Sequence, residues 1–160
     1  FWITASNKKE RVMAKPENLL IIVNTGADIP YNHYASYVIA FMAKQVSKVD
    51  NVTIYYGPNG IGMAKKGTLA GFTIEDSVKN LIADQMEGLS ASNLPDNLEQ
   101  LARFEKDQLG INIVSCATFN VIDGLAPTVN DTTGQEDFIT PVKLPQAAEA
   151  LMDADKLLYF

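Results

Sequence analysis

The order of hydrophobic and polar positions along the chain predicts alternating strands and helices. Continuous apolar runs are typical of strands that are buried on both faces, as in a parallel sheet. We expect such strands at residues 19–23, 52–56, 111–115, 138–142 and 156–160. Helices are expected between them at residues 34–46, 59–66, 74–87, 96–109, 117–123 and 145–152. This alternation predicts a three-layer α/β/α domain with a mainly parallel five-stranded sheet.

Several residues indicate where these elements begin and end. Asp96 followed by Glu99 resembles a capping box, so a helix is expected to start at Asp96. Gly110 suits the left-handed conformation that ends a helix. Pro141 interrupts the fourth predicted strand, which is therefore expected at a sheet edge or at a bulge.

The first long helix carries more apolar surface than one sheet contact requires. Its small and polar positions fall on one narrow stripe: Ser36, Ala40, Lys44 and Ser47. Most of the remaining surface is apolar: Tyr37, Val38, Ile39, Phe41 and Met42. A helix that covers a sheet needs only one apolar stripe, so we expect a second buried contact for this helix, such as one with another subunit.

Composition narrows the functional classes. The chain has 160 residues, a formal net charge of −6, one cysteine and one histidine. A negative charge disfavours broad contact with nucleic acid or with an anionic membrane, and no apolar run is long enough for a membrane span. A Cys/His zinc site and an internal disulfide are implausible, which suits a reducing cytoplasm. We expect no metal and no cofactor.

The first twelve residues, FWITASNKKERV, differ from the rest of the chain. They lack the apolar core of a signal peptide, and Met13 opens a plausible natural start. We therefore expect residues 1–12 to be a leading extension or a cloning remnant, and residues 13–160 to form a single domain.

The one cysteine, Cys116, follows the third predicted strand directly. Ligands of open parallel sheets bind beyond the carboxyl ends of the strands, where residues 24–33, 57–62 and 115–118 are expected to gather. A helix that starts at Ala117 would direct its first N–H groups toward the thiol and favour the nucleophilic thiolate. Free cysteine also often packs as a small hydrophobic residue, so the residues alone leave both interpretations open.

Other candidate groups form no complete catalytic constellation. His33 could reach the same sheet edge and pair with Cys116, or it could cap the first long helix. Gly57 and Gly62 have the spacing of a phosphate loop, but Met63 stands where lysine is required, which favours a tight turn. The tyrosines at 31, 34 and 37 could form a pocket wall, a core or an interface.

Four stretches together resemble the DsrE/DsrF-like family, which includes the TusD sulfur-relay proteins. They are LLIIVNTGAD, NVTIYYGPNGI, LGINIVSCATF and LMDADKLLYF, and they span about residues 18–160. The resemblance implies a small α/β subunit that assembles into trimers or hexamers. It also implies a cysteine that carries sulfur, as a persulfide or a bound thiosulfonate, between partner proteins.

Transferred by position, the resemblance assigns the sulfur-carrying role to Cys116. Backbone N–H groups near it could hold thiosulfonate oxygens, and we assign Ala117, Thr118, Gly26 and Gly57 to this binding role. The donor and acceptor would be proteins or small sulfane-sulfur compounds. A chain without a second cysteine cannot resolve a persulfide as an internal disulfide. A carrier is therefore favoured over a multiple-turnover enzyme.

Two other functions remain open from the residues. The chain could be an oligomeric binding or assembly module of the same fold, in which Cys116 is inert. A hydrolase that uses Ser115 or His33 would lack a second histidine and the sequence context of a serine nucleophile.

Overall fold

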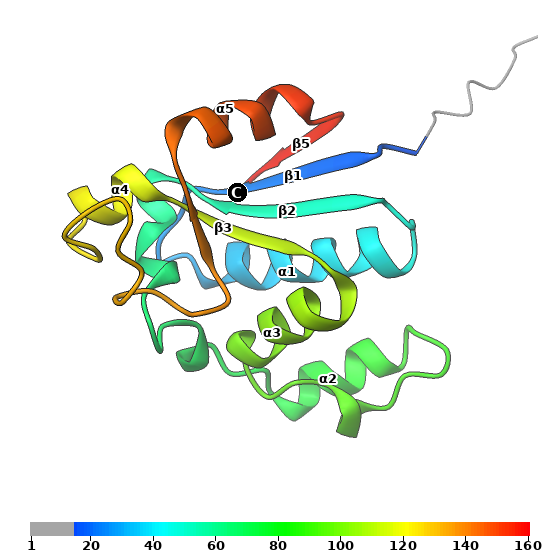
Figure 1. The fold of residues 1–160 in the computed structure, drawn as a ribbon. Coiled ribbons are helices and arrows are strands. Elements are labelled where there is room, and N and C mark those ends of the chain that lie inside the picture. Colours follow the sequence, from blue (N-terminus) through cyan, green and yellow to red (C-terminus); the bar gives the residue numbers. More distant parts are fainter. Residues whose placement is uncertain (1–14) are drawn as a thin grey trace, which may run out of the picture.

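In residues 15–160, the computed structural model describes alternating strands and helices (Figure 1). The strands are β1 (Asn18–Val23), β2 (Asn51–Tyr56), β3 (Asn112–Cys116), β4 (Thr140–Val142) and β5 (Lys156–Tyr159). The α-helices are α1 (Pro30–Gln45), α2 (Asp76–Ala83), α3 (Leu98–Leu109), α4 (Ala117–Ile122) and α5 (Leu144–Asp153). Short 3₁₀ helices are η1 (Pro58–Ala64), η2 (Leu69–Gly71) and η3 (Ala91–Asn93). The expectation for residues 1–12 lies outside the described residues.

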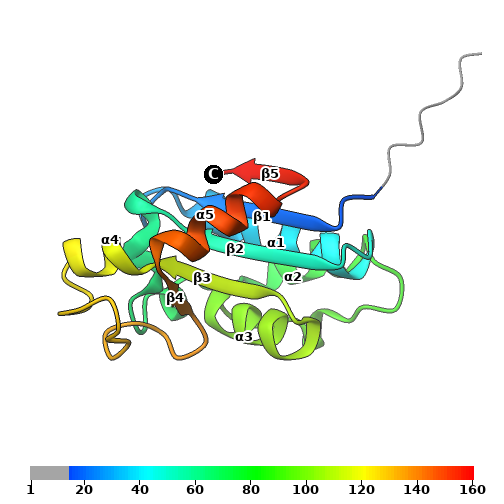
Figure 2. The ribbon, with the colours of Figure 1, turned by 45° about the horizontal axis from the view of Figure 1, so that its top comes forward.

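The strands form one sheet in the order β4-β3-β2-β1-β5, and every neighbouring pair is parallel. Helices α1, α2 and α3 lie on one side of the sheet, and α5 lies on the other (Figure 1). Figure 2 shows α5 crossing over the strands near β1 and β2. The predicted three-layer α/β/α fold with a five-stranded parallel sheet is confirmed.

The main core lies between the sheet and α1. Ile54 and Tyr56 on β2 are fully buried there, as is Tyr37 on α1. Ser36 and Ala40 are fully buried as well, so these two small residues of the stripe face the sheet and let the helix approach it closely. The apolar surplus of α1 therefore lies on the opposite side of the helix, where side chains such as Val38 stay exposed.

Helix α3 begins at Leu98, two residues later than the sequence indicates. Asn97 is the N-cap, and its side-chain oxygen accepts a hydrogen bond from the Gln100 N–H at 2.9 Å. The side chain of Gln100 accepts from the Asp96 N–H at 2.9 Å. The capping box predicted at Asp96 is wrong because the Asp96 carboxylate forms an ion pair with Lys79 on α2 instead.

Other boundaries differ by a few residues. Helix α2 is shorter than the predicted 74–87, and the fourth strand starts at Thr140 because Phe138 and Ile139 turn into the core before it. Pro141 lies on β4 at the edge of the sheet, as predicted. Gly110 ends α3 with φ of 69°, which confirms its left-handed conformation.

A carboxylic acid lies inside the core. Glu105 on α3 is fully buried, and neither carboxyl oxygen has a hydrogen-bond partner. Burial raises its pKa to about 9, so the group is neutral at pH 7. Nearby, the hydroxyl oxygens of Tyr37 and Tyr56 hydrogen-bond to each other at 2.7 Å. Burial also raises the pKa of Tyr37 well above its usual value.

We expect Glu105→Gln to gain stability relative to the parent protein as pH rises. The folded pKa of about 9 exceeds the ordinary value of 4.5, so between these values the folded protein keeps a proton that the unfolded chain has released. The stability contributed by Glu105 is thus full below about pH 4.5 and is lost progressively up to about pH 9. At pH 8 the stability of the variant relative to the parent protein should therefore be about 5 kcal/mol higher than it is at low pH.

Urea unfolding between pH 5 and pH 9 measures this difference. Glu149→Gln, on the exposed surface of α5, is the matched control and should show little change with pH. A difference between Glu105→Gln and the parent protein that stays constant over this range would mean that Glu105 is not held neutral in the core.

Candidate functional site

Cys116 is the last residue of β3 and the N-cap of α4. This position confirms the strand-to-helix junction expected from the sequence, at the carboxyl edge of the sheet. The side chain is buried, with 4% of the residue exposed. Helix α4 has only six residues, and the first N–H groups of any helix lack partners within it. Those of Ala117 and Thr118 therefore lie next to Cys116 in the chain.

Tyr55 on β2 is the polar neighbour of the thiol. Tyr55 pairs with Val114 in the parallel register, and Cys116 lies two residues further along β3 on the same face. Burial, together with a hydrogen bond to Cys116, raises the pKa of Tyr55 well above its usual value. The phenol therefore stays protonated and can donate to the sulfur. The tyrosine is only half-buried, so part of its side chain is open to solvent.

Tyr55 was not identified from the sequence. The available signal was the alternation along β2, which places Tyr55 and Tyr56 on opposite faces of the sheet. The missing information was the register between β2 and β3, which brings Tyr55 next to Cys116.

Ser115 belongs to a buried polar cluster behind Cys116. Its Oγ donates to Oε1 of Gln135 at 3.2 Å and accepts from Nδ2 of Asn120 at 3.0 Å. The Asn120 amide also donates to Gln135 at 2.8 Å, and Gln135 donates to the carbonyl of Ile139. The cluster joins β3 and α4 to the loop before β4. Ser115 therefore has a structural role. This network contains no histidine that could activate its hydroxyl.

His33 lies on α1 and is fully buried. Its Nε2 lies 2.7 Å from the carbonyl oxygen of Gly26, which can only accept, so Nε2 carries the proton. Burial lowers the pKa of His33, and the neutral ring packs edge-on against Phe72. In the part of the chain that the structure describes, no hydrogen bond joins His33 to Cys116. The expected pairing of these two residues remains a prediction.

The other assigned binding residues lie in the loops at the carboxyl edge. Asn24 connects two of these loops, because its Oδ1 accepts from the Asn59 N–H at 3.0 Å and its Nδ2 donates to the Tyr159 hydroxyl at 2.7 Å. A Cβ on Gly57 would lie 3.1 Å from Asn24 Oδ1, so Gly57 leaves space for this bridge. Gly26 serves as the acceptor for His33. Their role in ligand binding remains a prediction.

In residues 15–160, no group of three or more His, Cys, Asp or Glu side chains is placed to hold a metal ion. Among the same residues, no helix combines the length and apolar character that crossing a bilayer requires.

Comparison with known proteins gives a structural relative. The chain is similar to the YchN protein from E. coli, whose crystal structure superposes with a TM-score of 0.57 at 12% sequence identity. The alignment covers 90% of this chain and 99% of YchN. At this identity the likeness shows the fold alone, and that fold is DsrE-like. A scan of protein-family models finds no match, and a search of curated proteins finds none.

We expect Gly60→Ala to destabilise the carboxyl edge of the sheet. A Cβ at Gly60 would lie 2.3 Å from the carbonyl oxygen of Val23, which is backbone and cannot easily move. The loss of stability should be about 1–3 kcal/mol in urea unfolding. Gly62→Ala, in the same 3₁₀ helix, meets nothing within 4 Å and is the matched control. Equal effects of the two substitutions would contradict this close contact.

We expect Tyr55→Ala to expose the thiol of Cys116. Removal of the ring uncovers the sulfur, which should outweigh the loss of a hydrogen-bond donor to the thiolate. The reaction with a disulfide reagent should therefore accelerate by about tenfold, equivalent to ~1.4 kcal/mol of opening free energy. The rate is measured on the folded protein at fixed pH. Tyr31→Ala, at an exposed site on α1, should leave the rate unchanged. An unchanged rate in Tyr55→Ala would show that other groups cover the sulfur.

Proposed function

We propose that the protein carries sulfane sulfur on Cys116 and transfers it to a partner. The observation that supports this most directly is the position of the only cysteine. It ends β3 at the carboxyl edge of a parallel sheet, next to a half-buried tyrosine that can donate to sulfur. The DsrE-like fold and the ordered sequence resemblance support the same function. The carrier role comes from this combination, since a cysteine at a strand end alone does not define chemistry.

The transfer proposed for Cys116 is a thiol exchange. The thiolate attacks the outer sulfur of a donor persulfide, R–S–SH, and a new S–S bond forms while the donor leaves as RS⁻. Cys116 then holds the sulfur as Cys–S–SH. An acceptor thiolate attacks that outer sulfur, becomes the new persulfide and releases the Cys116 thiolate. Each step breaks one S–S bond and forms another, so no external oxidant or reductant is needed.

Tyr55 would have two roles in this exchange. Its hydroxyl donates to the anionic sulfur, which stabilises thiolate and persulfide alike. Its ring also limits access, because Cys116 is only 4% exposed. Reaction with a partner would therefore require the side chain of Tyr55 to move aside. This restriction would protect a bound persulfide from small thiols in solution.

Intact mass after brief incubation with polysulfide or tetrathionate tests the carrier role. We expect folded protein to gain sulfur or a thiosulfonate group on one site, and to lose it when an acceptor thiol is added. Cys116→Ala, which has no thiol, is the control for non-covalent binding. The urea-unfolded parent protein shows that the reagent modifies the accessible thiol.

The second candidate is an assembly module of the same fold with an inert cysteine, and the burial of Cys116 favours it. In that case the thiol of the folded protein stays unmodified while the unfolded chain is labelled. This outcome would refute sulfur transfer by the chain on its own.

A further inference from the structure

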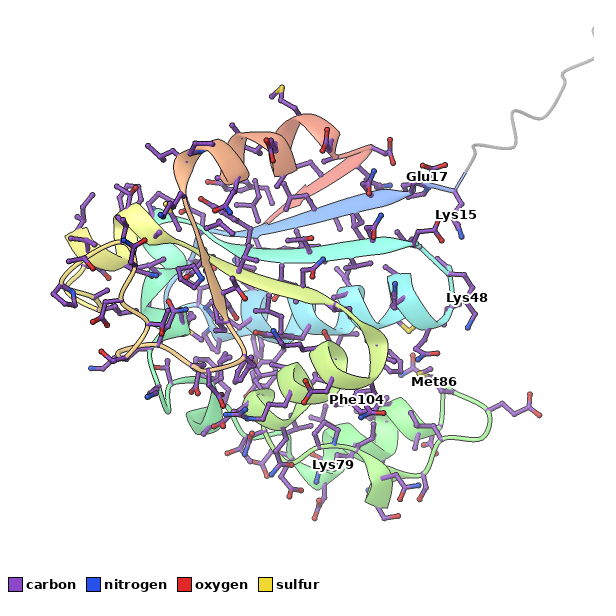
Figure 3. All side chains as sticks on the ribbon, viewed as in Figure 1. Lys15, Glu17, Lys48, Lys79, Met86 and Phe104 are labelled. Atoms are coloured by element: carbon purple, nitrogen blue, oxygen red, sulfur yellow. The ribbon has the colours of Figure 1, made fainter. Side chains whose placement is uncertain are left out.

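An apolar groove runs between α1 and α2, and α3 completes its lining. It has a volume of about 710 Å³ and lies on the side of the sheet away from α5 (Figure 1). Figure 3 labels two of its lining residues, Phe104 on α3 and Met86 after α2. Tyr55 and Cys116 belong to the other face of the sheet, so the groove is separate from the site proposed for sulfur transfer.

The side chains that α1 directs into the groove form one long apolar stripe. Tyr34, Val38, Met42 and the C-cap residue Val46 recur at every fourth position, and all four line the groove. Val38 is 42% exposed and Met42 is 37% exposed. Because each helical residue rises by about 1.5 Å, the stripe is about 18 Å long. The apolar surplus of α1 thus faces an open groove.

Helix α2 also leaves apolar side chains uncovered in the groove. It has only eight residues, and a helix this short depends on tertiary packing for its stability. Val78 is nevertheless 44% exposed, and it lines the groove together with Ile82. Lining residues this exposed make the groove too open to bury most of a small ligand. Two apolar helical walls favour a helix as the occupant, because its side chains can pack against both.

The charge of the α2 wall indicates what kind of helix fits. The segment 75–87 carries four acidic residues and one lysine, a formal net charge of −3. That lysine, Lys79, is already paired with Asp76 and Asp96. Among residues 15–160, Glu75 is the only acidic or basic residue that lines the groove. Basic side chains on a partner would therefore be attracted to this wall.

The other two helices do not reverse this sign. Helix α1 carries one lysine, Lys44, which donates to the carbonyl of Asp50. Helix α3 carries three acidic and two basic residues, and one of the basic residues, Arg103, is paired with Glu99. The surroundings of the groove are therefore acidic on balance.

A second copy of the chain is a poorer occupant than a basic partner. In a symmetric contact both copies present the same surface, so the acidic walls of two α2 helices would be brought together. The whole chain also has a formal net charge of −6. Like charges across an interface oppose association, which favours a partner of different composition.

We propose that the groove binds an amphipathic helix of a partner protein, with its apolar face between α1 and α2 and basic residues along its flanks. A helix of about 12 residues matches the ~18 Å stripe of α1. Apolar side chains of the partner, spaced three and four residues apart, contact Val38, Met42 and Phe104. A lysine or arginine beside them lies near Glu75. This interaction surface is additional to the function proposed for Cys116.

Fluorescence anisotropy with three synthetic peptides tests this binding on the full-length protein. The basic peptide is a helix of about 16 residues with leucine along one face and lysine and alanine on the other. The acidic peptide has glutamate in place of lysine, and the scrambled peptide has the composition of the basic one without an apolar face. The basic peptide should bind at least about tenfold more tightly than either, and more weakly as salt rises.

Two substitutions locate the binding in the groove. Met42→Gln, which puts a polar side chain of similar size in the wall, should weaken binding of the basic peptide by about tenfold, and Met152→Gln on the exposed surface of α5 should not. Glu75→Lys should weaken the basic peptide and strengthen the acidic one. Glu149→Lys on α5 changes the net charge equally and should affect neither peptide. Far-ultraviolet circular dichroism confirms that each variant is folded.

Three results would overturn the proposal. The first is a basic peptide that binds no more tightly than the scrambled one, a comparison that needs only the parent protein. The second is an equal effect of Glu75→Lys and Glu149→Lys, which would mean attraction to the net charge alone. The third is a dimer, seen by sedimentation, that Met42→Gln dissociates while no peptide binds, since the groove would then be a contact between two copies of the chain.

Discussion

The parallel pairing of β2 with β3 is the constraint on which the candidate site depends. Its register sets Tyr55 beside Val114, two residues before Cys116 on the same face, and Tyr56 beside Ser115 on the opposite face. A shift of one residue would exchange these faces and place Tyr55 in the core. The hydrogen bonds of the sheet therefore determine which polar group meets the sulfur and which meets Tyr37.

The two faces of the sheet are covered unequally, and this separates two regions of the molecule. On the side of α1, the small residues Ser36 and Ala40 bring the helix close to the strands, and Tyr37 fills the core. The larger apolar side chains of α1 are left on its outer side, where they line a groove. On the other side, α5 lies over the strands near β1 and β2 (Figure 2). Tyr55 stays half-exposed there. A candidate reactive group and an open apolar groove thus lie on opposite faces of the sheet.

Buried polar groups have two different roles in this fold. The amides of Asn120 and Gln135 hydrogen-bond with Ser115 and fix the loop before β4 against the junction of β3 and α4. Because most polar atoms of this cluster have hydrogen-bond partners, the cluster provides a rigid support behind Cys116. Glu105 has no such partners, and the protein accommodates it by keeping it protonated. The burial of Glu105 makes the stability of the core depend on pH. Glu105 is not part of the candidate functional site around Cys116.

Much of the fold of this protein could be predicted from the sequence by itself. Short apolar runs predicted the strands, the alternation with helical segments predicted the layers, and the position of Cys116 after an apolar run predicted the junction of β3 with α4. Gly110 and Pro141 acted as expected because backbone conformation and a missing N–H are local properties. Such features depend on neighbours within a few residues, which is why they could be predicted from the chain alone.

The tertiary structure decided what depends on residues far apart in the chain. Asp96 does not cap α3, because its carboxylate forms an ion pair with Lys79 on another helix. Glu105 occupies a core-facing position of α3, although an ionisable side chain normally indicates an exposed position. The meeting of Tyr55 with Cys116 and the groove between α1 and α2 required the strand order and the placement of helices. These arise from long-range pairing, and a single sequence contains no local signal for it.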